Sequence, residues 1–159
     1  MKVEKLREAT SQEIDEALSH WNIPKIPLKS NLEQTIEIKV ESELAMSNWL
    51  YDLVRQNIKR GRTFQLRDVL LQQQADCLGY AKLLSRLGQK FALDIGIVEV
   101  VIDNGGRYTP HYVNLVRLPS GERQFADLWY GSINLKQVKF GGNTEKLIGW
   151  WIKDLDWDD

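Results

Sequence analysis

Apolar positions recur at helical spacing in the first part of the chain. Residues 10–20 carry an apolar stripe, and Thr10 with Glu13 fits the capping box that begins many helices. Residues 43–59 carry a longer apolar stripe, which predicts a second helix that Gly61 closes. The pattern therefore indicates two amphipathic helices in the N-terminal part of the chain.

A third helical pattern follows a short connection. Residues 62–75 are expected to form this connection, with one apolar turn in it. The helix is predicted from about Asp76 to Leu87, and Gly88 is its expected C-terminal stop. Cys77 would then lie in its first turn.

Alternating apolar and polar positions predict strands. Residues 35–41 alternate strictly, which favours a half-buried strand, or an arm that packs on the main body or on another subunit. Further strands are predicted after the third helix, at 95–102, 111–118, 123–129 and 134–140. A helix followed by an antiparallel meander is typical of the α+β class. We expect an N-terminal helix and extended arm over residues 1–43 and one main domain over residues 44–159.

Composition and charge narrow the class of protein. The chain has 159 residues, of which 43% are hydrophobic and 27% charged, as in an ordinary globular domain. Its net charge of -1 provides no global field for nucleic acid or an anionic membrane, so neither is an expected partner. A local group of basic residues is interpreted as a solvated helix end and loop; it comprises Arg55, Lys59, Arg60, Arg62 and Arg67.

The cysteine and histidine counts exclude two common frameworks. One cysteine allows no internal disulfide, and one cysteine with two histidines makes no recognisable zinc site, so no metal or other cofactor is expected. The N-terminal residues lack the apolar run of a signal peptide, and no stretch has the length of a membrane span. A cytoplasmic location is therefore predicted, where a free thiol persists.

Three side chains follow one another in an order that suits a thiol triad. Cys77 begins a helix, where unpaired N–H groups and the helix dipole favour a thiolate. His111 begins a strand, and Asp127 lies inside an apolar strand, where a carboxylate needs a hydrogen-bonding partner. A lone cysteine is more often a small buried apolar residue, so the hypothesis depends on all three together.

The triad sets a condition on the hairpin between the last two of these residues. A two-residue loop would make paired residue numbers sum to 241, which puts His111 and Asp127 on opposite faces of the sheet. We therefore predict an odd-length loop or a bulge, with an even sum such as 240 and with Asp127 opposite Val113. Gly121 can supply the positive φ that a three-residue loop needs.

Three stretches of the chain resemble the transglutaminase-like superfamily of thiol enzymes, which has a papain-like fold. These stretches are Ala75-Asp76-Cys77-Leu78-Gly79-Tyr80-Ala81, His111-Tyr112-Val113-Asn114 and Asp127-Leu128-Trp129, and the resemblance covers about residues 44–131. It implies peptide or isopeptide hydrolysis, or transfer of a glutamine acyl group to an amine, on a protein or peptide substrate. Cys77 would be the nucleophile, His111 the general base and then acid, and Asp127 the residue that orients His111.

Two positions depart from the pattern of that family, and alternatives stay open. Ala75 stands where glycine is usual, and Val113 stands where an aromatic residue is usual. The first departure favours a second hypothesis, in which the domain is a catalytically silent interaction module. A third hypothesis, acetyl transfer from a thioester donor, uses the same triad, but the sequence indicates no binding site for such a donor.

The remaining candidates concern the oxyanion and the substrate groove. The backbone N–H of Cys77 is the expected first oxyanion donor. The side chain of Gln72, Gln73 or Gln74 could be the second, or the three form only a polar loop. Trp129 is expected to shield the His–Asp bond from water. Contacts between copies in a homo-oligomer would use the N-terminal arm or the C-terminal Trp-rich segment with Trp150, Trp151 and Trp157.

Overall fold

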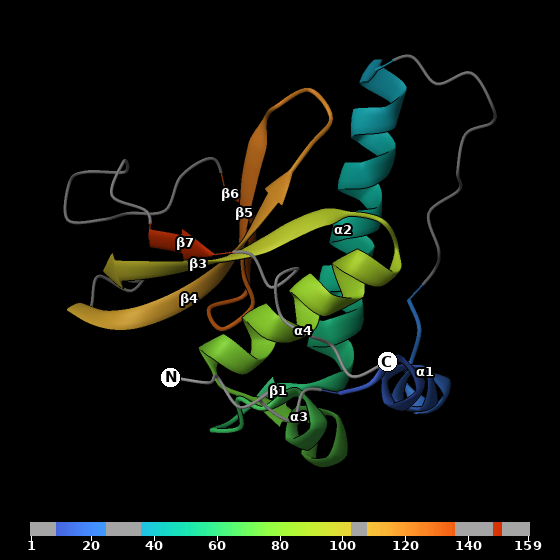
Figure 1. Cartoon of the computed structure of the whole chain (residues 1–159), viewed down its shortest axis with the longest axis vertical. Coiled ribbons are helices and arrows are strands. Elements are labelled where there is room, and N and C mark those ends of the chain that lie inside the picture. The colour runs from blue at the N-terminus through green and yellow to red at the C-terminus, as the bar shows by residue number, and fades with distance from the viewer. Residues whose placement is uncertain (1–8, 25–35, 103–107, 136–147, 151–159) are drawn as a thin grey trace.

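The computed structural model describes residues 9–24, 36–102, 108–135 and 148–150 (Figure 1). In chain order its elements are α1 (Ser11–His20), α2 (Ile36–Asn57), β1 (Lys59–Arg60), α3 (Leu66–Gln72), β2 (Gln74–Ala75), α4 (Cys77–Lys90), β3 (Asp94–Ile102), β4 (Tyr108–Arg117), β5 (Arg123–Asp127), β6 (Ser132–Leu135) and β7 (Ile148–Trp150). These helices precede the strands of the main sheet, so the predicted α+β class is confirmed.

The main sheet is antiparallel and has the order β6-β5-β4-β3-β7. The predicted meander accounts for four of these strands, and β7 adds at the free edge of β3, which the sequence pattern did not indicate. The predicted fourth strand, residues 134–140, overlaps β6 at residues 134–135, and its residues 136–140 lie outside the described ranges. Helix α4 packs against β3 and β4, and the long helix α2 packs against α4 (Figure 1).

The main core lies between these two helices and the sheet. Side chains that are almost completely buried come from every layer and include Leu50, Val54, Leu84, Leu87 and Ile95. Burial of one such aliphatic side chain contributes about 2 kcal/mol, so the core fixes how α4 lies on the sheet. A smaller cluster lies within the sheet itself and joins Val98, Val113, Leu115 and Phe125.

The hairpin between β4 and β5 has the predicted even register. Paired residue numbers sum to 240, as for Asn114 with Ala126. The Leu118 N–H donates to the Glu122 carbonyl at 2.9 Å and closes a three-residue loop. Gly121 in this loop has a φ of +87°, the conformation that the loop required of it. The prediction of an odd-length loop is therefore confirmed.

The first helix begins as predicted. Glu13 N donates to the Thr10 hydroxyl at 3.1 Å, and Thr10 N donates to the Glu13 carboxylate at 3.4 Å. This reciprocal pair is the capping box that the sequence indicated.

The strand or arm predicted at residues 35–41 was wrong for residues 36–41. These residues form the first turns of α2, and the expected boundary between residues 43 and 44 falls inside this helix. Extending an existing helix fixes one residue for each new hydrogen bond, whereas starting a separate strand needs partners of its own. A short alternating segment next to a strong helical stripe therefore joined the helix.

Two glycines predicted to end helices instead allow close packing. Helix α2 already ends at Asn57, and a Cβ at Gly61 would lie 2.2 Å from Oε1 of Gln74. Gly88 lies within α4, and a Cβ there would lie 2.9 Å from Cδ1 of Ile95. The connection predicted at residues 62–75 contains helix α3 and strand β2 rather than a single turn.

The segment before α3 crosses the first turn of α4 at close range. A Cβ at Gly79 would lie 2.4 Å from the Thr63 carbonyl oxygen, which also accepts the Asp76 N–H at 2.9 Å. The Tyr80 hydroxyl donates to the Ile58 carbonyl at 3.0 Å in the protein interior. Gly79 and Tyr80 therefore dock the start of α4 onto the segment that follows α2.

Replacing Gly79 by alanine should test this contact. We expect Gly79→Ala to lower the free energy of unfolding by about 1–3 kcal/mol, because the new methyl group has no room beside Thr63. Alanine is normally better than glycine inside a helix by about 1 kcal/mol, so the sign of the change is diagnostic. Urea denaturation would measure it, with Gln89→Ala in the same helix as the near-neutral control. A Gly79→Ala protein more stable than the parent would contradict the proposed contact.

Candidate active site

Cys77 is the first residue of α4, as predicted, and is partly buried. Asp76 caps this helix and accepts the Gly79 N–H at 2.7 Å. Burial raises the pKa of Asp76, although hydrogen bonds from Gly79 and Leu78 and the charge of Lys82 act in the opposite direction. The thiol thus stands at the positive end of a capped helix.

A short parallel pair of strands holds the residues just before Cys77. Strand β1 pairs with β2, so that Arg60 lies opposite Ala75. The Lys59 N–H donates to the Gln73 carbonyl at 2.9 Å, and the Gly61 N–H donates to the Ala75 carbonyl at 2.8 Å. Ala75 is completely buried in this arrangement. The nucleophile therefore follows a backbone that is fixed on both sides.

His111 and Asp127 form a buried pair. Nε2 of His111 lies 2.8 Å from Oδ2 of Asp127, and the two side chains are 4% and 0% exposed. The register of β4 and β5 pairs Asn114 with Ala126, next to Asp127, and the side chains of His111 and Asp127 meet across these strands. The Tyr130 N–H donates to Oδ1 of Asp127 at 3.2 Å, so both carboxylate oxygens are bound.

Cys77 also lies close enough to His111 to raise the pKa of its ring. Because Nε2 carries the bond to Asp127, Nδ1 is the ring nitrogen left for the thiol. Burial alone would lower the pKa of His111, but the hydrogen bonds with Asp127 and Cys77 and the negative charges of both raise it to about 9. The structure thus brings together the three side chains that the sequence singled out.

The ring beside His111 is not the one that the sequence suggested. Tyr130 lies with its ring centroid 5.5 Å from that of His111. Trp129 lies against the guanidinium of Arg60, whose central carbon is 3.9 Å from the ring centroid, and its role in shielding the His–Asp bond stays a prediction. Tyr130 and Arg60 were missed by sequence reasoning. The sequence signal that could have indicated Tyr130 was Gly131, which ends the turn after Asp127 and has a φ of +73°.

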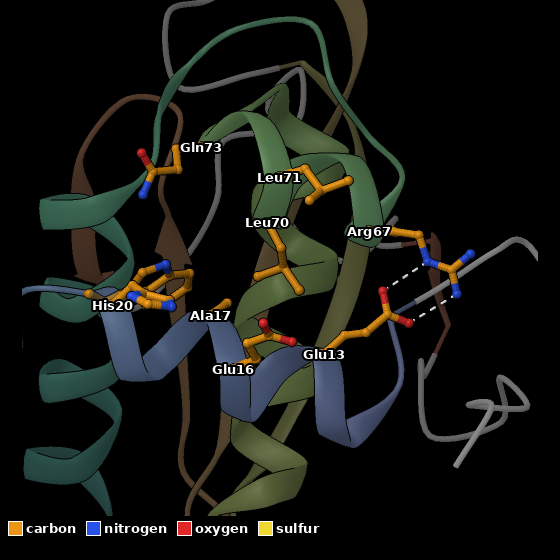
Figure 2. A pocket seen from close by; sticks show the side chains of 9 residues that line it. Glu13, Glu16, Ala17, His20, Arg67, Leu70, Leu71 and Gln73 are labelled. Atoms are coloured by element: carbon orange, nitrogen blue, oxygen red, sulfur yellow. Dashed lines mark hydrogen bonds and ion pairs between the residues drawn. The ribbon is translucent and has the colours of Figure 1, made fainter.

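Of the three glutamines proposed as oxyanion donors, Gln72 and Gln74 contact each other through their side chains, whereas Gln73 lies apart. The Gln72 carbonyl accepts from the Thr63 hydroxyl at 3.1 Å and from the Gln74 side-chain amide at 3.3 Å. The Gln73 side chain lines a pocket between α1 and α3 (Figure 2). A role for these side chains at the oxyanion stays a prediction, and the Cys77 N–H stays the expected first donor.

The pocket in Figure 2 is a surface feature separate from the triad. It has a volume of about 310 Å³, and none of the three triad residues lines it. The lining residues are Glu13, Glu16, Ala17, His20, Trp21, Arg67, Leu70, Leu71 and Gln73. Arg67 and Glu13 form an ion pair across it at 2.9 Å. Elsewhere in the described ranges, no three histidine, cysteine, aspartate or glutamate side chains gather as a metal site.

Two further sequence observations can be placed. Val113, where the resembling family has an aromatic residue, is 1% exposed and packs with Val98 and Phe125, so it is a core residue. Of the basic residues predicted to be a solvated helix end and loop, Lys59, Arg60 and Arg62 are exposed. Arg55 donates to the Leu128 carbonyl at 3.2 Å, and Arg67 pairs with Glu13.

A scan against protein-family models finds no match for this chain, and a search of curated proteins finds no relative. None of the helices in the described part of the chain combines the length and the apolar character that a membrane crossing requires.

The charge of His111 can be measured directly. We expect its ring to titrate with a pKa of about 9, followed by NMR in a His20→Gln background that leaves a single histidine signal. Asp127→Asn should lower this pKa, because it removes a negative charge at hydrogen-bonding distance. A ring that titrates at or below the ordinary 6.5 in the folded parent would contradict the described environment.

The same shift makes stability depend on pH with a definite sign. The folded pKa is raised above the unfolded value of 6.5, so the stabilisation is fully present below pH 6.5 and is lost as pH rises through about 9. Its full size is about 3 kcal/mol. The difference in free energy of unfolding between the parent and His111→Gln, which does not titrate, should therefore shrink from pH 6 to pH 9.5. A difference that grows over this interval would be inconsistent with the raised pKa.

Proposed function

We propose that this protein is a thiol enzyme that acts on amide bonds, by peptide or isopeptide hydrolysis or by transfer of an acyl group to an amine. The observation that carries the proposal is that a single ring, His111, is hydrogen-bonded to the buried Asp127 and also interacts with Cys77. The papain-like and transglutaminase-like core that residues 44–131 resemble would account for bringing them together from a helix and two strands.

The chemistry follows from the positions of these groups. The Cys77 thiolate attacks the carbonyl carbon of the amide, and the electron pair of the carbonyl moves to its oxygen. The His111 imidazolium then gives its proton to the leaving nitrogen as the C–N bond breaks, which leaves a thioester on Cys77 and a neutral ring. Water or an amine then attacks the thioester carbon, and His111 takes the proton of the attacking group. The C–S bond breaks, which regenerates the Cys77 thiolate and releases the product acid or amide.

Asp127 would hold the ring in the orientation for both proton transfers. It binds Nε2 with one oxygen and the Tyr130 N–H with the other, so the carboxylate cannot rotate away from His111. The negative charge of Asp127 also stabilises the imidazolium. A buried structural pair would not need a carboxylate held on both oxygens, so this arrangement favours a catalytic role for Asp127.

Thiol reactivity tests the nucleophile without knowledge of the substrate. Iodoacetamide should alkylate Cys77 at neutral pH, and His111→Ala should slow this alkylation at least tenfold, because the ring favours the thiolate. His20→Ala, the matched change at the other histidine, should leave the rate unchanged. Mass spectrometry of the labelled peptide would give the rate constants. Equal alkylation rates in the parent and His111→Ala would contradict the proposal that His111 activates the thiol of Cys77.

Amide chemistry itself is tested with unspecific protein substrates. Glutamine-rich protein incubated with a fluorescent amine should acquire label if the enzyme transfers acyl groups. Hydrolysis should instead release new primary amines, which are N-termini from peptide bonds and lysine side chains from isopeptide bonds. Cys77→Ser should abolish either product while the protein stays folded, because its hydroxyl is far less ionised than a thiol. Asp127→Asn should reduce turnover by about 10²–10⁴-fold, a range typical for loss of general acid–base assistance. A reactive thiol that forms neither product over a broad substrate panel would favour the silent interaction module.

A further inference from the structure

Arg60 connects the two halves of the candidate site. Its backbone lies opposite Ala75, two residues before Cys77. Its guanidinium carbon lies 3.9 Å from the ring centroid of Trp129, two residues after Asp127, and 6.0 Å from that of Tyr130. Tyr130 in turn lies against the ring of His111. The guanidinium is thereby held between the segment that carries the nucleophile and the turn that binds the carboxylate of the triad.

The way Arg60 is held leaves its hydrogen-bond donors available. Stacking on an aromatic ring uses the face of the guanidinium, whereas its N–H groups point outward in the plane of the group. Arg60 is exposed, and no carboxylate in the described part of the chain pairs with it. Arg67 and Arg117, by contrast, each pair with a carboxylate of the protein.

A pre-oriented guanidinium of this kind matches one chemical class of ligand. A carboxylate accepts two parallel N–H bonds from the edge of a guanidinium, and the stack reduces the side-chain freedom that such binding must otherwise remove. Arg60 is exposed and lies near Tyr130, whose ring lies against His111, so its N–H edge is accessible to a ligand at the candidate site.

We propose that Arg60 forms a carboxylate-binding subsite, so that the substrate carries a negatively charged carboxylate near the amide that Cys77 attacks. This inference rests on the proposed thiol function and adds the substrate class to it. The carboxylate can belong to an acidic side chain or to the C-terminus of a peptide, and both present the same two oxygens. Trp129 acts as the positioning residue that keeps the guanidinium in place.

Two alkylating agents of nearly equal size separate charge recognition from thiol reactivity. Iodoacetate carries a carboxylate and iodoacetamide does not. The rate constant of iodoacetate at Cys77, divided by that of iodoacetamide, therefore reports how strongly the positive charge and the hydrogen-bond donors of the subsite favour a carboxylate. Arg60→Gln should lower this ratio roughly three- to tenfold, while the iodoacetamide rate changes little. Arg60→Lys keeps the positive charge but lacks the two parallel N–H donors of the guanidinium, so it should give an intermediate ratio. If Arg60→Gln does not fold, Arg60→Lys is the variant to compare with the parent.

Arg62→Gln is the matched control, since it removes the same charge from a neighbouring exposed position. Chloroacetylated peptides with aspartate or asparagine next to the reactive group, each with a free or amidated C-terminus, then distinguish the two sources of carboxylate. Equal ratios in Arg60→Gln and Arg62→Gln, with Cys77 still reactive through His111, would overturn the subsite and leave the thiol function standing. An unreactive Cys77 in the parent would overturn both.

Discussion

The hydrogen bond between His111 and Asp127 is the interaction on which the candidate site depends. A carboxylate with no exposed surface is costly to keep charged unless its oxygens are bound, and removal of one partner from such a pair typically costs about 3–5 kcal/mol. The fold meets this requirement twice, with the ring on one oxygen and the Tyr130 N–H on the other. Both depend on a hairpin register that a loop one residue shorter would destroy, because every side chain of β5 would then change face. Gly121 is therefore as necessary to the pair as its two members, although it touches neither.

The residues that surround Cys77 in the sequence are explained mostly by packing. Gly79 is small because the Thr63 carbonyl lies against it, and the hydroxyl of Tyr80 binds a buried carbonyl. Ala81 packs against Ile97 on β3. A chain could keep all of these residues to dock a helix and still do no chemistry. For this reason the resemblance of the cysteine segment is weaker support for catalysis than the contact between Cys77 and His111.

The features that were predictable are those with short-range or periodic causes. The capping box at Thr10 and the start of α4 at Cys77 follow from local hydrogen bonds, and the even hairpin register follows from requiring His111 and Asp127 on one face. The errors arose where distant contacts decide. Gly88 was read as a helix end because glycine often is one, but its absent side chain admits Ile95 from β3.

The aromatic and cationic parts of the site were out of reach for the same reason. Arg60 meets Trp129 only because β1 pairs with β2 and the turn after β5 returns to the same place. Trp129 was marked by its position after Asp127, but Arg60 has no periodicity or spacing that links it to the site, so a basic stretch beside a helix end was the simplest interpretation. A stacked guanidinium is a property of the assembled fold, whereas a capping box is a property of four consecutive residues.

The electrostatics of His111 give the proposed cycle an internal order. Asp127 and Cys77 both raise the pKa of His111, and of these two neighbours Asp127 stays unchanged through the proposed cycle while Cys77 does not. Formation of a thioester removes the charge of Cys77 and its hydrogen bond, so one of the causes that raise the pKa of His111 disappears at that step. The ring would thus be an acid while the leaving amine needs a proton, and would become a better base once water or an amine must be deprotonated. The same three side chains could then serve both half-reactions without any movement of the backbone that holds them.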